Sequence, residues 1–232
     1  MLNYPADIRA FRAAWVSGNS NPLSSVTIRY LDYGQFTGRD EAGNLTGNYS
    51  VADTWIQATV ARRSTSGHTS WGLSAGVLSN SIGATSYQAI LFSGSVMLRL
   101  DSSRVKIGIA VQNLGWVQSP SWNRLPGQTE ITVSRKLAHL PLDLYLDGRW
   151  VDGRSTYGLG GVFQVNPMLQ VLIGTSTNRL TQMSGDGSLA DIFADTGFGL
   201  RLRLKGLMLS FGSYLYGPGG WAQGIGVEWN LN

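Results

Sequence analysis

The chain has 232 residues, including 30 glycines and no cysteine, with 14% charged residues and a net charge of +4 at pH 7. Without cysteine it forms no disulfide and has no thiolate chemistry. The basic residues do not form clusters with interleaved aromatic residues, as nucleic-acid interfaces require, so nucleic acid is not an expected partner. The low share of charged residues would leave the surface of a water-soluble domain poorly hydrated.

No stretch reaches the roughly 20 consecutive apolar residues that a transmembrane helix needs. The chain instead alternates apolar and polar residues in short segments bounded by turn residues, which predicts strands. A weaker pattern over 11 to 16 is compatible with a first strand. About twelve more are predicted over residues 24 to 34, 51 to 63, 70 to 79, 87 to 101, 103 to 114, 128 to 137, 140 to 150, 155 to 165, 168 to 178, 192 to 205, 207 to 216 and 221 to 231.

The connections between these strands differ in length in a regular way. Short turns are predicted near 101 to 103, 137 to 140, 166 to 167 and 205 to 206, and long segments at 35 to 50, 115 to 127 and 179 to 191. Outer-membrane barrels have short periplasmic turns and longer extracellular loops, whereas soluble sandwiches have no reason to keep such an asymmetry. We therefore expect an all-β fold, a transmembrane antiparallel up-and-down β-barrel of 12 to 14 strands, with residues 1–232 forming one domain.

Alternation also predicts which face of each strand meets lipid. In the segment 198 to 205, every second residue is apolar and the others include Arg201, Arg203 and Lys205. An Arg or Lys facing lipid near the midplane costs about 2–4 kcal/mol, so these three side chains are expected to face the lumen. By the same reasoning, the lumen-facing polar candidates are Arg201, Arg203, Lys205, Asp143, Asp147, Arg149 and Glu228.

The inward cationic row has two interpretations. It could form a track for an anion or substrate, or it could pair with acidic residues across a crowded polar interior. Sign-mixed lumens are common in closed barrels, which favours pairing with acids such as Asp143, Asp147, Glu130 and Glu228.

Tryptophan placement points to the same architecture. Six tryptophans are predicted near strand ends, where an indole ring can lie in lipid while its N–H reaches water. This aromatic girdle consists of Trp55, Trp71, Trp116, Trp150, Trp221 and Trp229.

The sequence gives little support for a metal site or for catalysis. The segment 36 to 44 is rich in oxygen ligands and glycine but does not have the spacing of a calcium loop, so no metal is expected. The two histidines, His68 and His139, lie in predicted turns away from any nucleophile motif, so we expect neither an enzyme nor a cofactor.

Several segments, in the same order, resemble the PorV/PorQ family, and PorQ more than PorV. The family consists of outer-membrane barrels that are related to the long-chain fatty-acid transporter fold and belong to the type IX secretion system of Bacteroidetes-like, Gram-negative bacteria. The most distinctive is YGQFTGRDEAGN at 33 to 44. The others are NLG at 113 to 115, LP at 125 to 126, RKLAHLP at 135 to 141, GFG at 197 to 199 and the final hairpin.

The resemblance implies a fourteen-stranded barrel, an N-terminal segment that enters the lumen, and an accessory role in holding or relaying secreted cargo at the cell surface. The partners it implies are outer-membrane lipid and secretion-system proteins or cargo, met through the long loops. The first nine residues do not read as a signal peptide, so either a signal has been removed or the chain is an N-terminally incomplete copy, and the abrupt entry into a strand favours the second. Compared with the family, the opening strand or strands would then be missing, and a closed fourteen-strand wall could not be completed. The alternatives are an outer-membrane channel for hydrophobic solutes and, with less support, a soluble β-barrel.

Overall fold

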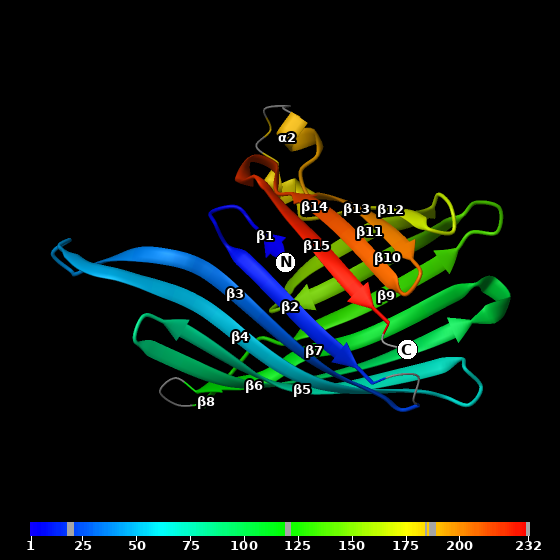
Figure 1. The fold of residues 1–232 in the computed structure, drawn as a ribbon, viewed down its shortest axis with the longest axis horizontal. Helices are drawn as coiled ribbons and strands as arrows, with labels where there is room; N and C mark the ends of the chain where they lie inside the picture. Colours follow the sequence, from blue (N-terminus) through cyan, green and yellow to red (C-terminus); the bar gives the residue numbers. More distant parts are fainter. Residues whose placement is uncertain (18–20, 119–121, 184, 186–188, 231–232) are drawn as a thin grey trace.

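The computed structural model describes residues 1–17, 21–118, 122–183, 185 and 189–230. These residues form a closed 14-strand antiparallel β-barrel (Figure 1), the fold class that the alternation predicts. The expectation that a fourteen-strand wall could not be completed from the strands present is wrong, because a two-residue strand, Leu2–Asn3, joins the first and last long strands. The strands are β1 (Leu2–Asn3), β2 (Arg9–Val16), β3 (Leu23–Arg39), β4 (Leu45–Arg63), β5 (Thr69–Ile82), β6 (Thr85–Leu100), β7 (Val105–Gln118), β8 (Trp122–Arg124), β9 (Gln128–Lys136), β10 (Leu142–Val151), β11 (Arg154–Gln164), β12 (Leu169–Ser176), β13 (Thr196–Leu204), β14 (Leu207–Leu215) and β15 (Trp221–Trp229).

Each strand of the ring pairs with its neighbours in sequence, with one exception. The three-residue β8 pairs only with β7, so that β9 is the next wall strand after β7. The ring closes through β1, whose two residues pair with β2 on one side and with β15 on the other. This closure is the shortest pairing in the described part of the wall.

The two faces of the wall differ as a membrane-spanning sheet requires. On β15, Ile225 and Val227 are 63% and 66% exposed, whereas Ala222, on the opposite face, is 6% exposed. On β13, Phe198, Leu200 and Leu204 are exposed, so the outer face of both strands is apolar. Because lipid offers no hydrogen-bond partner to a strand edge, a sheet with such an outer face has to close.

The interior is not a packed core. The accessible surface is 15666 Å², whereas a compact monomer of this mass would expose about 10,000 Å². Among the described residues, the buried apolar side chains are few and mostly small: Ala89, Leu91, Ala194 and Ala222. The barrel therefore encloses a hollow lumen. The apolar residues of its outer face are not buried in a protein core.

The long connections lie at the end of the barrel opposite the short turns, but one of them is not a loop. β3 and β4 extend to Arg39 and from Leu45, so most of the expected loop 35 to 50 is a hairpin that projects beyond the neighbouring strands (Figure 1). The predicted loop 115 to 127 contains the end of β7 and β8, apart from residues 119–121, which lie outside the described residues.

The third long connection, 179 to 191, contains the short helix α1 (Arg179–Gln182) and the start of α2 (Leu189–Ile192). Residues 184 and 186–188 of this segment lie outside the described residues. Two 3-10 turns, η1 (Asp101–Ser103) and η2 (Gly217–Gly219), complete the elements. Within the described ranges, no helix has the length and hydropathy to cross a bilayer.

Candidate functional site: the inner wall

The inner wall is the candidate site, because strand register brings polar side chains from distant segments into common rows. On β10, Asp143, Asp147 and Arg149 lie on the face opposite Leu144 and Leu146, which are exposed. On β13, Arg201 and Arg203 alternate with Leu200, Leu202 and Leu204. Glu228 alternates with Val227 and Trp229 on β15. The face opposite the apolar surface therefore carries these charged candidates, while Lys205 lies in the turn that follows β13.

Acidic and basic residues of the inner face stand next to each other on β9 and β10. Asp143 is opposite Lys136, and Arg149 is opposite Glu130. Opposite charges in directly paired positions stabilise a sheet by roughly 0.2–1 kcal/mol. None of these pairs comes within ion-pair distance in the described residues, where the ion pair present joins His68 Nδ1 and Asp101 Oδ2 at 3.3 Å in the turns.

Glu130 is held by neutral groups rather than by a cation. Gln112 Nε2 and Gln128 Nε2 each donate to Glu130 Oε2 at 3.4 Å, and Thr132 Oγ1 donates to Oε1 at 3.4 Å. The carboxylate lines a concavity of about 380 Å³ whose other lining residues include Ser74, Ser95 and Thr132. This part of the wall combines small polar side chains with glycine and apolar side chains.

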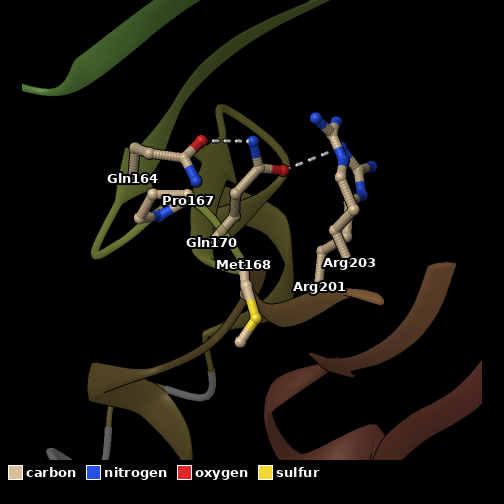
Figure 2. Close-up of a pocket in the computed structure, with 6 residues that line it drawn as sticks. All are labelled: Gln164, Pro167, Met168, Gln170, Arg201 and Arg203. Atoms are coloured by element: carbon tan, nitrogen blue, oxygen red, sulfur yellow. Dashed lines mark hydrogen bonds between the residues drawn. The ribbon is translucent and has the colours of Figure 1, made fainter. Parts of the chain in front are cut away.

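The cationic row of β13 is also bonded to neutral groups. Arg201 Nη1 donates to Gln170 Oε1 at 3.3 Å, and Gln170 Nε2 donates to Gln164 Oε1 at 2.6 Å (Figure 2). Gln164, Gln170, Arg201 and Arg203, with Pro167 and Met168, line a shallow pocket at the short-turn end. The expected pairing of this row with acidic residues across the lumen is not present among the described residues.

A second polar cluster, which the sequence did not single out, lies near the long-loop end of β3, β4 and β5. Tyr33 Oη donates to Asp53 Oδ2 at 2.9 Å, and Asn80 Nδ2 donates to Asp53 Oδ1 at 2.6 Å. Trp55 lies two residues after Asp53 on β4. The guanidinium of Arg29 packs over its ring, with 4.4 Å between Cζ and the ring centroid. Continuing the alternation of β4 would have placed Asp53 and Trp55 on one face.

The placement of Trp55 corrects one prediction. Trp55 is paired with Arg29 in the middle of β4, and its Nε1 is buried without a partner in the described residues. It therefore faces the interior and does not belong to an aromatic girdle. The reason is the face of the strand: Trp55 has the same parity on β4 as Asp53 and Gln57, which the strand-end placement did not take into account.

The other five predicted girdle residues lie near strand ends with exposed side chains: Trp71, Trp116, Trp150, Trp221 and Trp229. Trp15, near the end of β2, is 60% exposed and has the same placement, although the sequence analysis did not include it. A role of these rings at a lipid interface stays a prediction.

The segment considered for a metal forms the tip of the β3–β4 hairpin instead. Asp40 accepts hydrogen bonds from the Asn44 side chain at 3.0 Å and from the Asn44 backbone N–H at 2.7 Å. The side-chain bond from Asn44, followed by the backbone bond, lowers the pKa of the Asp40 carboxyl from its ordinary value. The carboxylate thus organises a turn, and the described residues contain no cluster of three metal-binding side chains.

No family model and no curated protein matches the chain. Among solved structures, CdiB from Acinetobacter baumannii is similar with a TM-score of 0.48 and 12% identity, over 95% of this chain and 50% of that one. The chain thus spans about half the length of CdiB. A mutant of the Rhodopseudomonas blastica porin is similar with a TM-score of 0.41 and 10% identity, over 99% of both chains.

A closed antiparallel barrel with an apolar outer face and a polar inner face is the architecture with which β-sheets span the bacterial outer membrane. The register and exposure of the described strands have both properties. The chain accordingly has the closed-barrel fold by which β-sheets span an outer membrane.

Proposed function

We propose that this chain is a non-enzymatic accessory protein of a type IX-like secretion system, which binds or relays secreted proteins at the cell surface. The observation that carries this proposal is the projecting β3–β4 hairpin. The segment 33 to 44, on which the resemblance to the PorV/PorQ family chiefly rests, lies in this hairpin and not in the barrel wall.

The projecting part of the hairpin has free edges on both sides. β3 pairs with β2 only as far as Asp32, and β4 pairs with β5 only from Val51. A two-stranded ribbon is marginally stable in water, and its unpaired edges can accept a strand from another chain. A partner that adds a strand here would pair with a free edge and would stabilise the ribbon.

The hairpin also offers apolar contacts. Phe36 and Tyr49 stack across the two strands with ring centroids 5.7 Å apart, and both are exposed. Leu45, at the start of β4, is 67% exposed. Because long loops of outer-membrane barrels face the exterior, these groups would meet partners outside the cell.

The test is a double variant, Phe36→Ser with Tyr49→Ser, in the full chain in its native membrane. We expect cross-linked partners and secreted cargo to decrease at least tenfold, while the barrel keeps its thermal stability. The matched control is Val77→Ser with Phe92→Ser on the outer wall, at positions that are exposed but lie within paired strands. Normal secretion with the hairpin variant, and no partner recovered with the unaltered chain, would exclude the proposal.

A channel is the second candidate, because the barrel is hollow. The residues around its 380 Å³ concavity include Ser74, Ser95, Thr132 and Glu130. The same lining also contains apolar side chains such as Val96 and Met97, so both polar and hydrophobic solutes are candidates. Two assays on vesicles that contain the chain distinguish the solute classes: swelling in sugar solutions reports polar solutes, and uptake of fatty acids reports hydrophobic ones. The absence of flux in both assays would exclude a channel.

A further inference from the structure

Two arginines on the inner face of β13 lie close together without an acidic partner. Arg201 and Arg203 are two positions apart on one strand face, so their Cα atoms are about 6.5–7 Å apart. Within the described residues neither guanidinium is within 4.0 Å of a carboxylate, since the ion pair found there is His68–Asp101. Arg201 is half-buried and Arg203 is exposed toward the bore.

The neighbouring amides orient Arg201 but do not neutralise it. Gln164 and Gln170 form a relay that ends on one N–H of Arg201, with Gln170 Oε1 as the acceptor. An arginine has five N–H donors, so the others stay available to a ligand. Figure 2 shows both guanidinium groups extending to the same side of the pocket, beyond Gln170.

The acidic groups of the inner wall are too far away to compensate this charge. Glu228 lies in the same row as Arg203, but Met208 on β14 stands between them. Two strand spacings separate their Cα atoms by about 9.6 Å, and no ion pair joins them in the part of the chain that the structure describes. Asp143 is on β10, three strands from β13. Lys205, in the adjoining turn, adds a further positive charge.

We infer that Arg201 and Arg203 form a binding site for a small oxyanion, a solute that carries a carboxylate or phosphate group. The planar guanidinium fork matches both groups, and an anion between two arginines relieves their mutual repulsion. Because short turns of outer-membrane barrels face the periplasm, the anion enters from that side. This site is independent of the hairpin and of the proposed secretion role.

The site is tested by calorimetric titration of the folded, detergent-solubilised chain with sodium phosphate and with succinate at constant ionic strength. We expect saturable binding of at least one anion, weakened at least tenfold by Arg201→Gln and by Arg203→Gln. Gln170→Glu places a carboxylate against Arg201 and should abolish binding while retaining the strand pairing. Arg149→Gln is the control, since Arg149 is on the same inner wall opposite Glu130.

Binding of phosphate alone or of succinate alone supports the site and assigns its ligand class. If neither anion saturates the unaltered chain, or if Gln170→Glu binds as tightly as that chain, the site does not exist. Circular dichroism of each variant shows that the barrel has folded, and Gln170→Glu keeps the test decisive if an arginine variant does not fold.

Discussion

Trp55 combines a favourable and an unfavourable contact in one side chain. Its ring carries the guanidinium of Arg29, a contact that contributes about 0.5–2 kcal/mol. Its buried Nε1 has no acceptor among the described residues, which costs about 1–3 kcal/mol. The face of the strand on which the residue lies decides both terms, and alternation with Asp53 and Gln57 on β4 assigns that face.

The two contacts of Trp55 can be separated by substitution. Trp55→Phe keeps a ring under Arg29 and removes the unpaired donor, so the free energy of unfolding should stay the same or rise by about 1 kcal/mol. Trp55→Leu also removes the donor but loses the ring, so its free energy of unfolding should be about 1 kcal/mol lower than that of Trp55→Phe. Urea unfolding in lipid vesicles measures both, with Trp221→Phe on the outer face as the control. If Trp55→Leu were as stable as Trp55→Phe, the ring contact would contribute nothing.

Asp40 makes the tip of the β3–β4 hairpin sensitive to acid. Its pKa is lowered because the charged carboxyl accepts hydrogen bonds from Asn44. A lowered folded-state pKa means that the stabilisation is present above the ordinary value of about 4 and is lost as the pH falls through the folded value. The protection of the Asn44 amide against exchange, corrected for the intrinsic rate at each pH, should therefore fall below about pH 4, and Asp40→Asn should remove this pH dependence. An unchanged acid response in Asp40→Asn would assign it to another group.

At the scale of elements, the sequence predicts most strands of the wall because lipid on one side and a polar bore on the other impose alternation. β11 was predicted over 155 to 165 and spans Arg154–Gln164, and β12 was predicted over 168 to 178 and spans Leu169–Ser176. The outer halves of β3 and β4 were not predicted, because Gly34, Gly38 and Gly47 read as turn residues. No lipid face imposes a pattern there, and cross-strand contacts such as Phe36–Tyr49 hold the pairing.

The connection between β12 and β13 is anchored by the buried carboxylate of Asp195, which is 1% exposed. Ser176 donates to Asp195 Oδ2 from its backbone N–H and from its hydroxyl, both at 2.7 Å. Tyr214 Oη donates to the other carboxylate oxygen. These bonds tie the connection to the ends of β12 and β14, which fixes it over the barrel.

Removing this carboxylate should release the connection without opening the wall. We expect Asp195→Ala to cost about 3 kcal/mol locally, because three donors lose a buried acceptor. Limited proteolysis should then cleave within 177 to 195 at least tenfold faster, while the exposed control Glu41→Ala cleaves at the original rate. Equal cleavage of both variants would show that Asp195 does not hold the connection.

At the scale of the whole molecule, alternation and turn asymmetry were enough to predict a closed barrel and the inward face of its charges. They could not predict which charges meet, since that depends on register: Arg201 is paired with Gln170 and Ser210, not with an acidic residue. They also could not predict β1, because two residues carry no periodicity. Which strands close the ring depends on pairing between distant segments, which is determined only when the whole barrel has formed.

The closure between β2 and β15 depends on few contacts. Besides the register pairs of Leu2 and Asn3, the Met1 amino group donates to the Ile225 carbonyl at 2.9 Å, and the Ile225 N–H donates back to Met1 at 3.0 Å. Among the described residues, β2 and β15 have no direct register pairs with each other. The wall should therefore open here before it opens elsewhere.

Gly224 allows a direct test of this closure. A Cβ at Gly224 would overlap the Leu2 side chain and lie 3.1 Å from the Met1 carbonyl oxygen in the backbone next to β1, whereas a Cβ at Gly212, in the same row on β14, meets only the Phe198 carbonyl oxygen, at 3.9 Å. Gly224→Val should therefore displace β1 and cost about 1–3 kcal/mol, while Gly212→Val should be neutral. The mobility of the barrel on detergent gels after heating reports its unfolding temperature. This temperature should fall only for Gly224→Val. Equal temperatures for both variants would mean that β1 does not limit the stability of the ring, because displacing the strand that joins β2 to β15 would then have left the wall intact.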